Sequence, residues 1–221
     1  VMKKEFNIDL NQANYFAGHS LGEYSALTCA NSLPFEEAVC LLYARGKFMQ
    51  EAVPSGKGAM LAVLGLKVEE IIEQINSISI NGTCEIANDN SPGQIVVSGD
   101  KDSIQILQNS LKKKSIRGLI LPVSAPFHCS LMESAEKKMS QKIKELIFKN
   151  PKPPIISNVT AKAENEASKI KELLIKQITS RVNWRESIEY MINNGVNEFI
   201  EIGPGKVLTS LVRRINKEVN V

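Results

Sequence analysis

The stretch Gly18-His19-Ser20-Leu21-Gly22 decides how we interpret the rest of this chain. It fits the pattern Gly-x-Ser-x-Gly, and it lies between a short apolar run ending at Ala17 and a helix-forming segment that continues to Leu27. In a nucleophile elbow a strand turns sharply into a helix, and small residues on both sides of the serine let the backbone cross closely. The positive end of the helix then favours an oxyanion. The pattern predicts a nucleophilic Ser20, while a plain strand-turn-helix corner stays an alternative because the pattern is short.

Composition narrows the class of protein. The chain has 221 residues, of which 43% are hydrophobic and 23% charged, so it can bury a substantial core in one domain with an inserted subdomain. The 4 cysteines are far apart and there are only 2 histidines, which supports neither a zinc site nor a disulfide framework. We therefore expect reduced thiols and no metal or cofactor.

Charge and hydropathy indicate where the protein works. No apolar run approaches the length of a membrane span, and no charged-then-apolar leader is present. The net charge of +3 and the 5% aromatic content do not favour a nucleic-acid partner. We expect a cytoplasmic protein that binds neither nucleic acid nor membrane.

A buried cation is predicted in the next helix. The pattern from Ser32 to Ala52 indicates a helix that Ser32 caps and in which Pro34 occupies the first turn. Arg45 falls inside the apolar stripe of this helix, and the positions three and four away are all apolar. A charge on the inner face needs a partner, and the helix offers none. The sequence leaves open whether Arg45 pairs elsewhere or extends its head to the edge of the core.

The segment 56–123 has a different pattern. Strands are expected at 59–66, 84–87, 94–98 and 118–123, with helices at 68–78 and 101–114. This β-α-β-β-α-β order is typical of a ferredoxin-like unit. Asn88 and Asn90 then fall in the central turn and are interpreted as turn formers. We expect an α/β fold in which 1–55 and 124–221 form the core and 56–123 is inserted.

A histidine precedes the next helix. His128 lies in a loop before a long amphipathic helix, whose positive end would keep the ring neutral and able to accept a proton. A serine nucleophile needs such a base. His19 is excluded because neighbouring side chains on an elbow point apart. The alternative is a histidine that only caps the helix. Beyond it, strands are expected at 155–159 and 198–202.

Five stretches together resemble a known family. They are 18–27 (GHSLGEYSAL), 45–50 (RGKFMQ), 90–94 (NSPGQ), 126–129 (PFHC) and 201–208 (EIGPGKVL). In this order, over nearly the whole chain, they resemble the bacterial malonyl-CoA:acyl carrier protein transacylases, which are similar to the acyltransferase domains of polyketide and fatty acid synthases. The resemblance implies a hydrolase-like parallel-sheet core with a ferredoxin-like insert.

The resemblance also implies the reacting groups. Ser20 would carry a malonyl ester, His128 would act as general base and then acid, and Arg45 would bind the malonyl carboxylate. The backbone N–H of Leu21 would be one oxyanion-hole donor. The region of Gln177 would orient the histidine in place of an aspartate.

Two further positions follow from the same resemblance. Asn90 would line the substrate cleft, and Phe127 would fill the space that an α-methyl group needs. The family begins with a Gly-Gln-Gly loop that supplies a second oxyanion donor, and no such stretch precedes Ser20 in this sequence. We expect the chain as given to be impaired on that account, because one donor is worth a factor of roughly 100 to 1,000 in rate.

The function implied is the transfer of malonyl from malonyl-CoA to the phosphopantetheine thiol of acyl carrier protein, for fatty acid biosynthesis, by a monomer. A serine thioesterase or esterase is the alternative, and it is disfavoured because a hydrolase of neutral acyl groups does not need an inward arginine. A catalytically inactive binding module is a third alternative.

Overall fold

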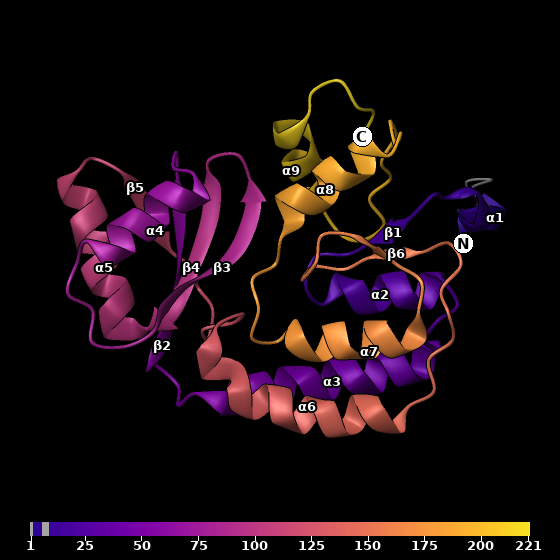
Figure 1. The fold of residues 1–221 in the computed structure, drawn as a ribbon, viewed down its shortest axis with the longest axis horizontal. Helices are drawn as coiled ribbons and strands as arrows, with labels where there is room; N and C mark the ends of the chain where they lie inside the picture. The colour runs from indigo at the N-terminus through magenta and orange to yellow at the C-terminus, as the bar shows by residue number, and fades with distance from the viewer. Residues whose placement is uncertain (1, 6–8) are drawn as a thin grey trace.

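The structure, a computed structural model, describes residues 2–5 and 9–221. They form an α/β fold with two sheets, as predicted (Figure 1). The elements in chain order are α1 (Met2–Glu5), η1 (Leu10–Gln12), β1 (Phe16–Ala17), α2 (Gly22–Cys29), α3 (Phe35–Ala52), β2 (Gly58–Leu64), α4 (Val68–Asn76), β3 (Cys84–Ser91), β4 (Gln94–Asp100), α5 (Lys101–Lys113), β5 (Arg117–Ile120), η2 (Ser130–Met132), α6 (Glu133–Glu145), β6 (Ile155–Ile156), β7 (Ala163–Glu164), α7 (Ala167–Lys176), α8 (Trp184–Asn193) and α9 (Val207–Ile215).

The four-stranded sheet belongs to the segment predicted as an insert. Its strand order is β3-β4-β2-β5, and every neighbouring pair is antiparallel. The connections β2-α4-β3 and β4-α5-β5 each skip one strand, which is the split βαβ arrangement. Helices α4 and α5 bury their apolar stripes against this sheet around Leu61, Val97 and Leu107. The predicted element order is therefore correct, and the boundaries at 56 and 123 stay a prediction.

The turn predicted in this sheet is wrong in extent. Strand β3 continues to Ser91, so that only Pro92 and Gly93 form the turn, with Gly93 at a φ of 69°. Asn88 and Asn90 therefore lie inside a strand and are buried. The strand extends there because partners outside the sheet meet it: the backbone on either side of Asn88 pairs with Val182, and the Asn90 side chain contacts His19.

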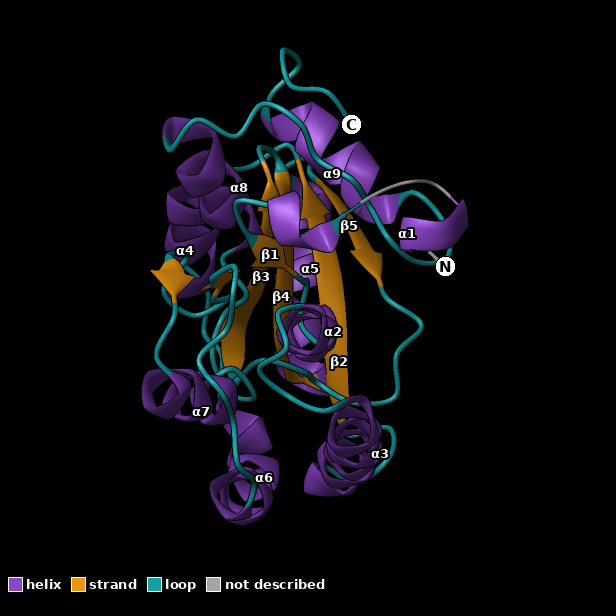
Figure 2. Ribbon diagram, turned by 90° about the vertical axis from the view of Figure 1, so that its right-hand side faces the viewer, coloured by secondary structure: helices purple, strands orange, loops and turns teal. Residues whose placement is uncertain are grey.

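The larger part packs helices on a small second sheet. In Figure 1, α2, α7, α3 and α6 lie on the side of the molecule away from β5. They share one core that includes Leu27, Leu41, Met139 and Leu174. Figure 2 shows α3, α6 and α7 viewed almost along their axes, below the sheets. No helix in the part of the chain that the structure describes is long and apolar enough to cross a membrane.

The second sheet is smaller than the sequence indicates. β1 pairs with β6 in parallel, and β6 pairs with β7 antiparallel. A parallel sheet is expected for the core, but within residues 9–221 it consists of a single parallel pair of strands. The strand expected at 198–202 is absent from this sheet: Glu198 makes a single bridge to Asn220. The side chains of Ile200 and Ile202 are 55% and 53% exposed, so this apolar alternation does not mark a buried strand.

The cap expected for α3 is also wrong. The helix begins at Phe35 after Pro34, which supplies no side-chain cap. The Ser32 hydroxyl instead donates to the backbone oxygen of Lys149 at 2.6 Å. A buried hydroxyl needs a partner, and here it ties the start of α3 to the segment after α6.

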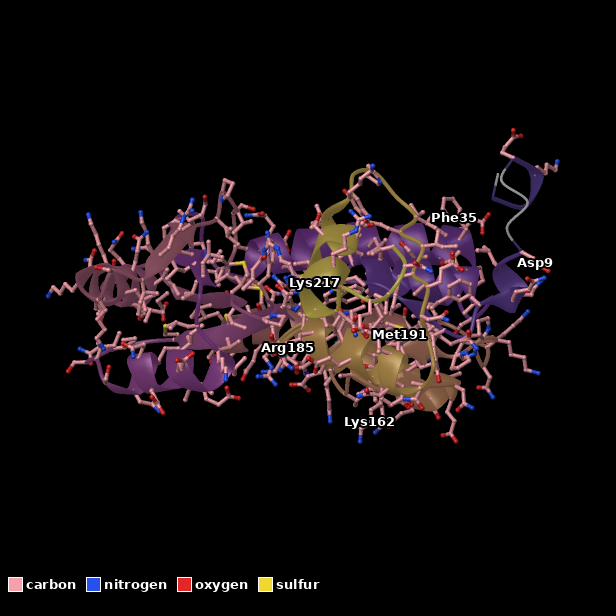
Figure 3. The ribbon with its side chains drawn as sticks, turned by 90° about the horizontal axis from the view of Figure 1, so that it is seen from above. Asp9, Phe35, Lys162, Arg185, Met191 and Lys217 are labelled. Carbon is pink, nitrogen blue, oxygen red and sulfur yellow. The ribbon has the colours of Figure 1, made fainter. Side chains whose placement is uncertain are left out.

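The two parts of the molecule meet where β3 contacts α8. The backbone N–H of Asp89 donates to the oxygen of Val182 at 3.0 Å, and that of Val182 donates to Ala87 at 2.8 Å. The guanidinium of Arg185 lies 2.8 Å from the buried carboxylate of Asp89. Figure 3 shows Arg185 near the middle of the molecule, between the two parts. This junction holds Asn90 beside the turn that follows β1.

Candidate active site

The chain turns sharply between β1 and α2, and Ser20 occupies the turn. Its φ is 53°, in the left-handed region that serine rarely adopts. A Cβ added to Gly18 would lie 2.0 Å from the backbone carbon and oxygen of Gly22, so Gly18 is required by close packing. A Cβ on Gly22 would meet nothing within 4 Å. The expectation that both glycines are needed for the crossing thus holds for Gly18 and is wrong for Gly22.

Ser20 and His128 form the central contact of the site. The serine Oγ lies 2.7 Å from His128 Nε2, and His128 Nδ1 lies 2.9 Å from the backbone oxygen of Gln177. A carbonyl oxygen can only accept, so Nδ1 carries the proton and Nε2 is free to accept the serine proton. This is the tautomer that a general base requires. His128 does not cap the next helix, because η2 begins after Cys129 and α6 after Met132.

The His128 ring is neutral because of its surroundings. Burial and then the nearby Arg45 cation lower the pKa of His128 to about 3, although the hydrogen bond to Gln177 opposes the shift. The sequence indicated the positive end of the following helix as the cause. In the structure the main cause is the loss of solvent around a ring that is 4% exposed.

Arg45 reaches the nucleophile from α3. Its Nη2 donates to Ser20 Oγ at 2.9 Å and to Gln177 Oε1 at 3.3 Å. The residue is 7% exposed, so its head does not extend to the edge of the core. Across residues 9–221 no carboxylate lies within ion-pair distance of it, and its buried Nε has no hydrogen-bond partner. The site thus contains a cation with unused donors.

Gln177 contacts all three of these residues. Its backbone oxygen accepts from His128, and its Oε1 accepts from Arg45. Its Nε2 donates to the backbone oxygen of Ser20 at 3.0 Å and to Glu23 Oε2 at 2.7 Å. The orientation of the ring therefore comes from the backbone of Gln177, while the side chain fixes the serine and the arginine.

A backbone donor stands beside the serine. Leu21 precedes the first residue of α2, and within the described part of the chain its N–H donates to no acceptor. The side chain of Leu21 is 57% exposed, so the position is open to a ligand. A free N–H at the start of a helix suits an anionic oxygen.

Asn90 and Phe127 each adjoin a residue of the site in sequence or in space. Asn90 Oδ1 is 2.8 Å from His19 Nε2, and the His19 ring packs 5.5 Å from Trp184 between centroids. His19 therefore bonds to Asn90, while the neighbouring Ser20 bonds to His128. Phe127 is partly buried against both the larger core and a small cluster that includes Met60.

Two residues of the site, Asn158 and Glu23, are not predicted from the sequence. Asn158 Oδ1 accepts from the Ser20 N–H at 2.6 Å, and Glu23 Oε2 accepts from the Asn158 N–H at 3.1 Å. Glu23 resembles an ordinary acid in the first turn of a helix. Asn158 follows β6, the parallel neighbour of β1, and polar residues at the carboxyl ends of adjacent parallel strands are the signal that could have identified it.

No metal site accompanies this arrangement in the described residues: no group of three or more His, Cys, Asp or Glu side chains is placed to hold an ion. The arrangement can instead transfer an acyl group through a serine ester. It provides a nucleophile, a neutral base, an oxyanion donor and a cation.

Comparison with known proteins agrees with this chemistry. The model of the acyl transferase domain family matches residues 11–220. The chain is 44% identical over 200 residues to the malonyl CoA-acyl carrier protein transacylase of Escherichia coli strain K12, covering 90% of this chain and 65% of that protein. It therefore spans just under two thirds of the length of this relative.

Solved structures show the same fold. The crystal structure of an acyl carrier protein S-malonyltransferase from Vibrio cholerae superposes with a TM-score of 0.94 at 42% identity, covering 99% of this chain and 71% of that one. A malonyl-transacylase solved in complex with a type II PKS acyl-carrier protein superposes with a TM-score of 0.90 at 40% identity, covering 94% of this chain and 67% of that one.

Proposed function

Because this chain belongs to the acyl transferase domain family, we propose that it transfers malonyl from malonyl-CoA to the phosphopantetheine thiol of an acyl carrier protein. The names of the relatives support this choice of donor and acceptor. The observation that carries the proposal is the unpaired Arg45 guanidinium on the serine hydroxyl. Three further properties stay predictions: a cytoplasmic location, a monomeric state and a role in fatty acid biosynthesis.

The first half-reaction loads the serine. Ser20 Oγ attacks the thioester carbonyl while its proton moves to His128 Nε2, and the carbonyl oxygen becomes an oxyanion beside the Leu21 N–H. The carbon–sulfur bond then breaks, and the proton on His128 passes to the leaving CoA sulfur. The products are a malonyl ester of Ser20 and free CoA.

The second half-reaction reverses these steps with a different thiol. The phosphopantetheine thiol gives its proton to His128, and its sulfur attacks the ester carbonyl. The bond to Ser20 Oγ breaks, and Oγ recovers the proton from His128. One base thus serves both halves, and the kinetics are ping-pong.

The free carboxylate of malonyl accounts for Arg45. A planar guanidinium binds a carboxylate through two parallel hydrogen bonds. Arg45 offers an unpaired Nε and an Nη2 that now rests on Ser20. A neutral acyl group would leave this buried cation without a carboxylate in direct contact, which is why an esterase is the weaker interpretation.

The decisive experiment traps the ester. The protein is mixed with malonyl-CoA without carrier, quenched and digested, and the peptides are analysed by mass spectrometry. We expect one malonyl group on the peptide that contains Ser20, and none in Ser20→Ala. Addition of a holo acyl carrier protein should discharge the ester onto the carrier.

Two results would overturn the proposal. A malonyl adduct on a cysteine in place of Ser20 would remove the assigned nucleophile. Rapid release of free malonate, with no gain from added carrier, would establish a thioesterase.

A further inference from the structure

The conformation of Ser20 requires external support. A non-glycine residue in the left-handed region persists only where the surrounding structure imposes it. Ser20, at a φ of 53°, lies between β1 and α2, close to the first turn of the helix. Neither element forms hydrogen bonds that fix the orientation of the Ser20 N–H, so the support comes from elsewhere in the fold.

Asn158 supplies hydrogen bonds on both sides of the serine. Its Oδ1 accepts from the Ser20 N–H at 2.6 Å, and its Nδ2 donates to the backbone oxygen of Gly18 at 2.8 Å. The residue lies in the turn between β6 and β7 and is 1% exposed. One amide thus binds the peptide group that precedes the nucleophile and the carbonyl two residues before it.

Glu23 holds the backbone of Asn158 in turn. Its Oε2 accepts from the Asn158 N–H at 3.1 Å and from Gln177 Nε2 at 2.7 Å. Glu23 is 1% exposed and belongs to α2, the helix that begins right after the elbow. The carboxyl group therefore couples the turn that holds Ser20 to the residue that orients His128.

We propose that Asn158 is a positioning residue of the reaction: its side-chain amide holds the backbone of Ser20 so that Oγ points at His128, and Glu23 fixes the backbone from which that amide extends. The inference rests on the proposed function only for the nature of the acyl group. It predicts that loss of the amide slows chemistry at Ser20 in molecules that remain folded.

An aspartate at this position separates positioning from simple stabilisation. An ionised carboxylate in the Asn158→Asp variant would present an oxygen to the Gly18 carbonyl and repel it. When protonated, the same side chain has one acceptor and one donor and reproduces both bonds of asparagine. The Asn158→Asp variant should therefore recover at low pH, whereas Asn158→Ala should not.

The test measures the reactivity of Ser20 directly. A fluorophosphonate probe, which labels activated serines, is reacted with wild type, Asn158→Asp and Asn158→Ala, and the rates are divided by the folded fraction from circular dichroism. Malonyl-CoA loading is measured in parallel. We expect both rates to fall about a hundredfold in Asn158→Ala, because a displacement of about 1 Å at a reacting atom can slow a reaction by that factor. The rate of Asn158→Asp relative to wild type should rise at least about tenfold from pH 7.5 to pH 5.

Ratios to wild type remove the titration of His128, which all variants share, and repeating the comparison in a Glu23→Gln background removes the titration of Glu23, which contacts Asn158. Ser32→Ala is the matched control, because it deletes a buried donor to a backbone oxygen far from the elbow. It should lower the melting temperature and leave both rates unchanged.

Wild-type labelling rates in folded Asn158→Ala would overturn the inference, as would a ratio for Asn158→Asp that does not change with pH. If Asn158→Ala does not fold, the aspartate variant decides alone. A wild type that reacts with the probe but not with malonyl-CoA would contradict the proposed function and leave the positioning test intact.

Discussion

Arg45 donates to Ser20 Oγ at 2.9 Å, and the same oxygen lies 2.7 Å from His128 Nε2. The nucleophile thus stands between a cation and a neutral base. The cation favours the alkoxide but also lowers the basicity of the ring. A substrate carboxylate on Arg45 would offset its charge, so the acyl group that the site selects would also make His128 a stronger base.

This relationship predicts a shift in pH dependence. His128 has a pKa of about 3 in part because Arg45 is near. Replacing Arg45 by Ala should raise that pKa toward the ordinary value of 6.5, so the acid limb of kcat/KM should move to higher pH. The pH profile of Ser20 loading and the NMR titration of His128 measure it. If the acid limb stays at the same pH in Arg45→Ala, the Arg45 charge does not lower the pKa of His128.

Arg45 should also select the acyl group. Removing one partner of a buried charge pair costs roughly 2 to 5 kcal/mol. We expect Arg45→Ala to lower kcat/KM for malonyl-CoA at least about thirtyfold while loading from acetyl-CoA stays equal or improves. Arg45→Lys keeps the positive charge but cannot form two parallel hydrogen bonds, so its kcat/KM for malonyl-CoA should lie between those of wild type and Arg45→Ala. A parallel loss for both substrates would assign Arg45 to the fold.

The elbow glycines should differ in tolerance. Gly18→Ala places a methyl group 2.0 Å from backbone atoms of Gly22. These backbone atoms cannot move aside by a change of rotamer, as a side chain could. We expect a loss of at least about 2 kcal/mol in the free energy of unfolding, measured with urea. Gly22→Ala, which meets open space, is the control and should be neutral or stabilising.

Glu23 should make stability depend on pH. Burial raises the pKa of this carboxyl to about 7, although Gln177, Asn158 and Arg45 oppose the shift. The folded state therefore holds a proton that the unfolded state has released between about pH 4.5 and 7, so the contribution of Glu23 to stability falls as pH rises through that window.

Replacing Glu23 by Gln removes this contribution while an amide oxygen can still accept both hydrogen bonds. Relative to wild type, the variant should gain free energy of unfolding as pH rises from about 4.5 to 7, by at most about 3 kcal/mol. His128 acts in the opposite direction between about pH 3 and 6.5, equally in both proteins. Urea melts at pH 5 and 7.5 measure the difference, and an equal stability change in both proteins would contradict the assigned shift.

Phe127 should exclude branched acyl groups. It precedes His128 and is partly buried between two apolar clusters. One methyl in such a pocket is worth about 1 to 3 kcal/mol, so Phe127→Ser should raise loading from methylmalonyl-CoA relative to malonyl-CoA about 10- to 200-fold. Competition between the two thioesters measures the ratio. An unchanged ratio would place the selectivity elsewhere.

Local patterns were enough to predict part of this site. Ser20 is indicated by the glycines around it, and Arg45 by an apolar stripe on its own helix, so neither prediction needed distant contacts. His128 was located for a sound reason, the need for a base, but the cause of its neutrality lies in burial, which depends on the whole fold.

The errors concern residues whose conformation depends on distant partners. Asn88 and Asn90 have the composition of a turn, yet β3 extends through them because the backbone beside Asn88 pairs with Val182 and the Asn90 side chain contacts His19. Asn158 could not be connected with Ser20 from the sequence, since 138 positions separate them and only the parallel pairing of β1 with β6 brings them together.

The junction of β3 with α8 divides the site between two structural units. Ser20, Arg45, His128 and Gln177 all belong to the larger part, while Asn90 reaches the site from the four-stranded sheet. The reacting groups and the residue that contacts His19 thus come from different segments of the chain. Exchange of the sheet between homologues, with the Asp89–Arg185 pair retained, would let evolution or an engineer alter substrate choice while the reaction stays intact.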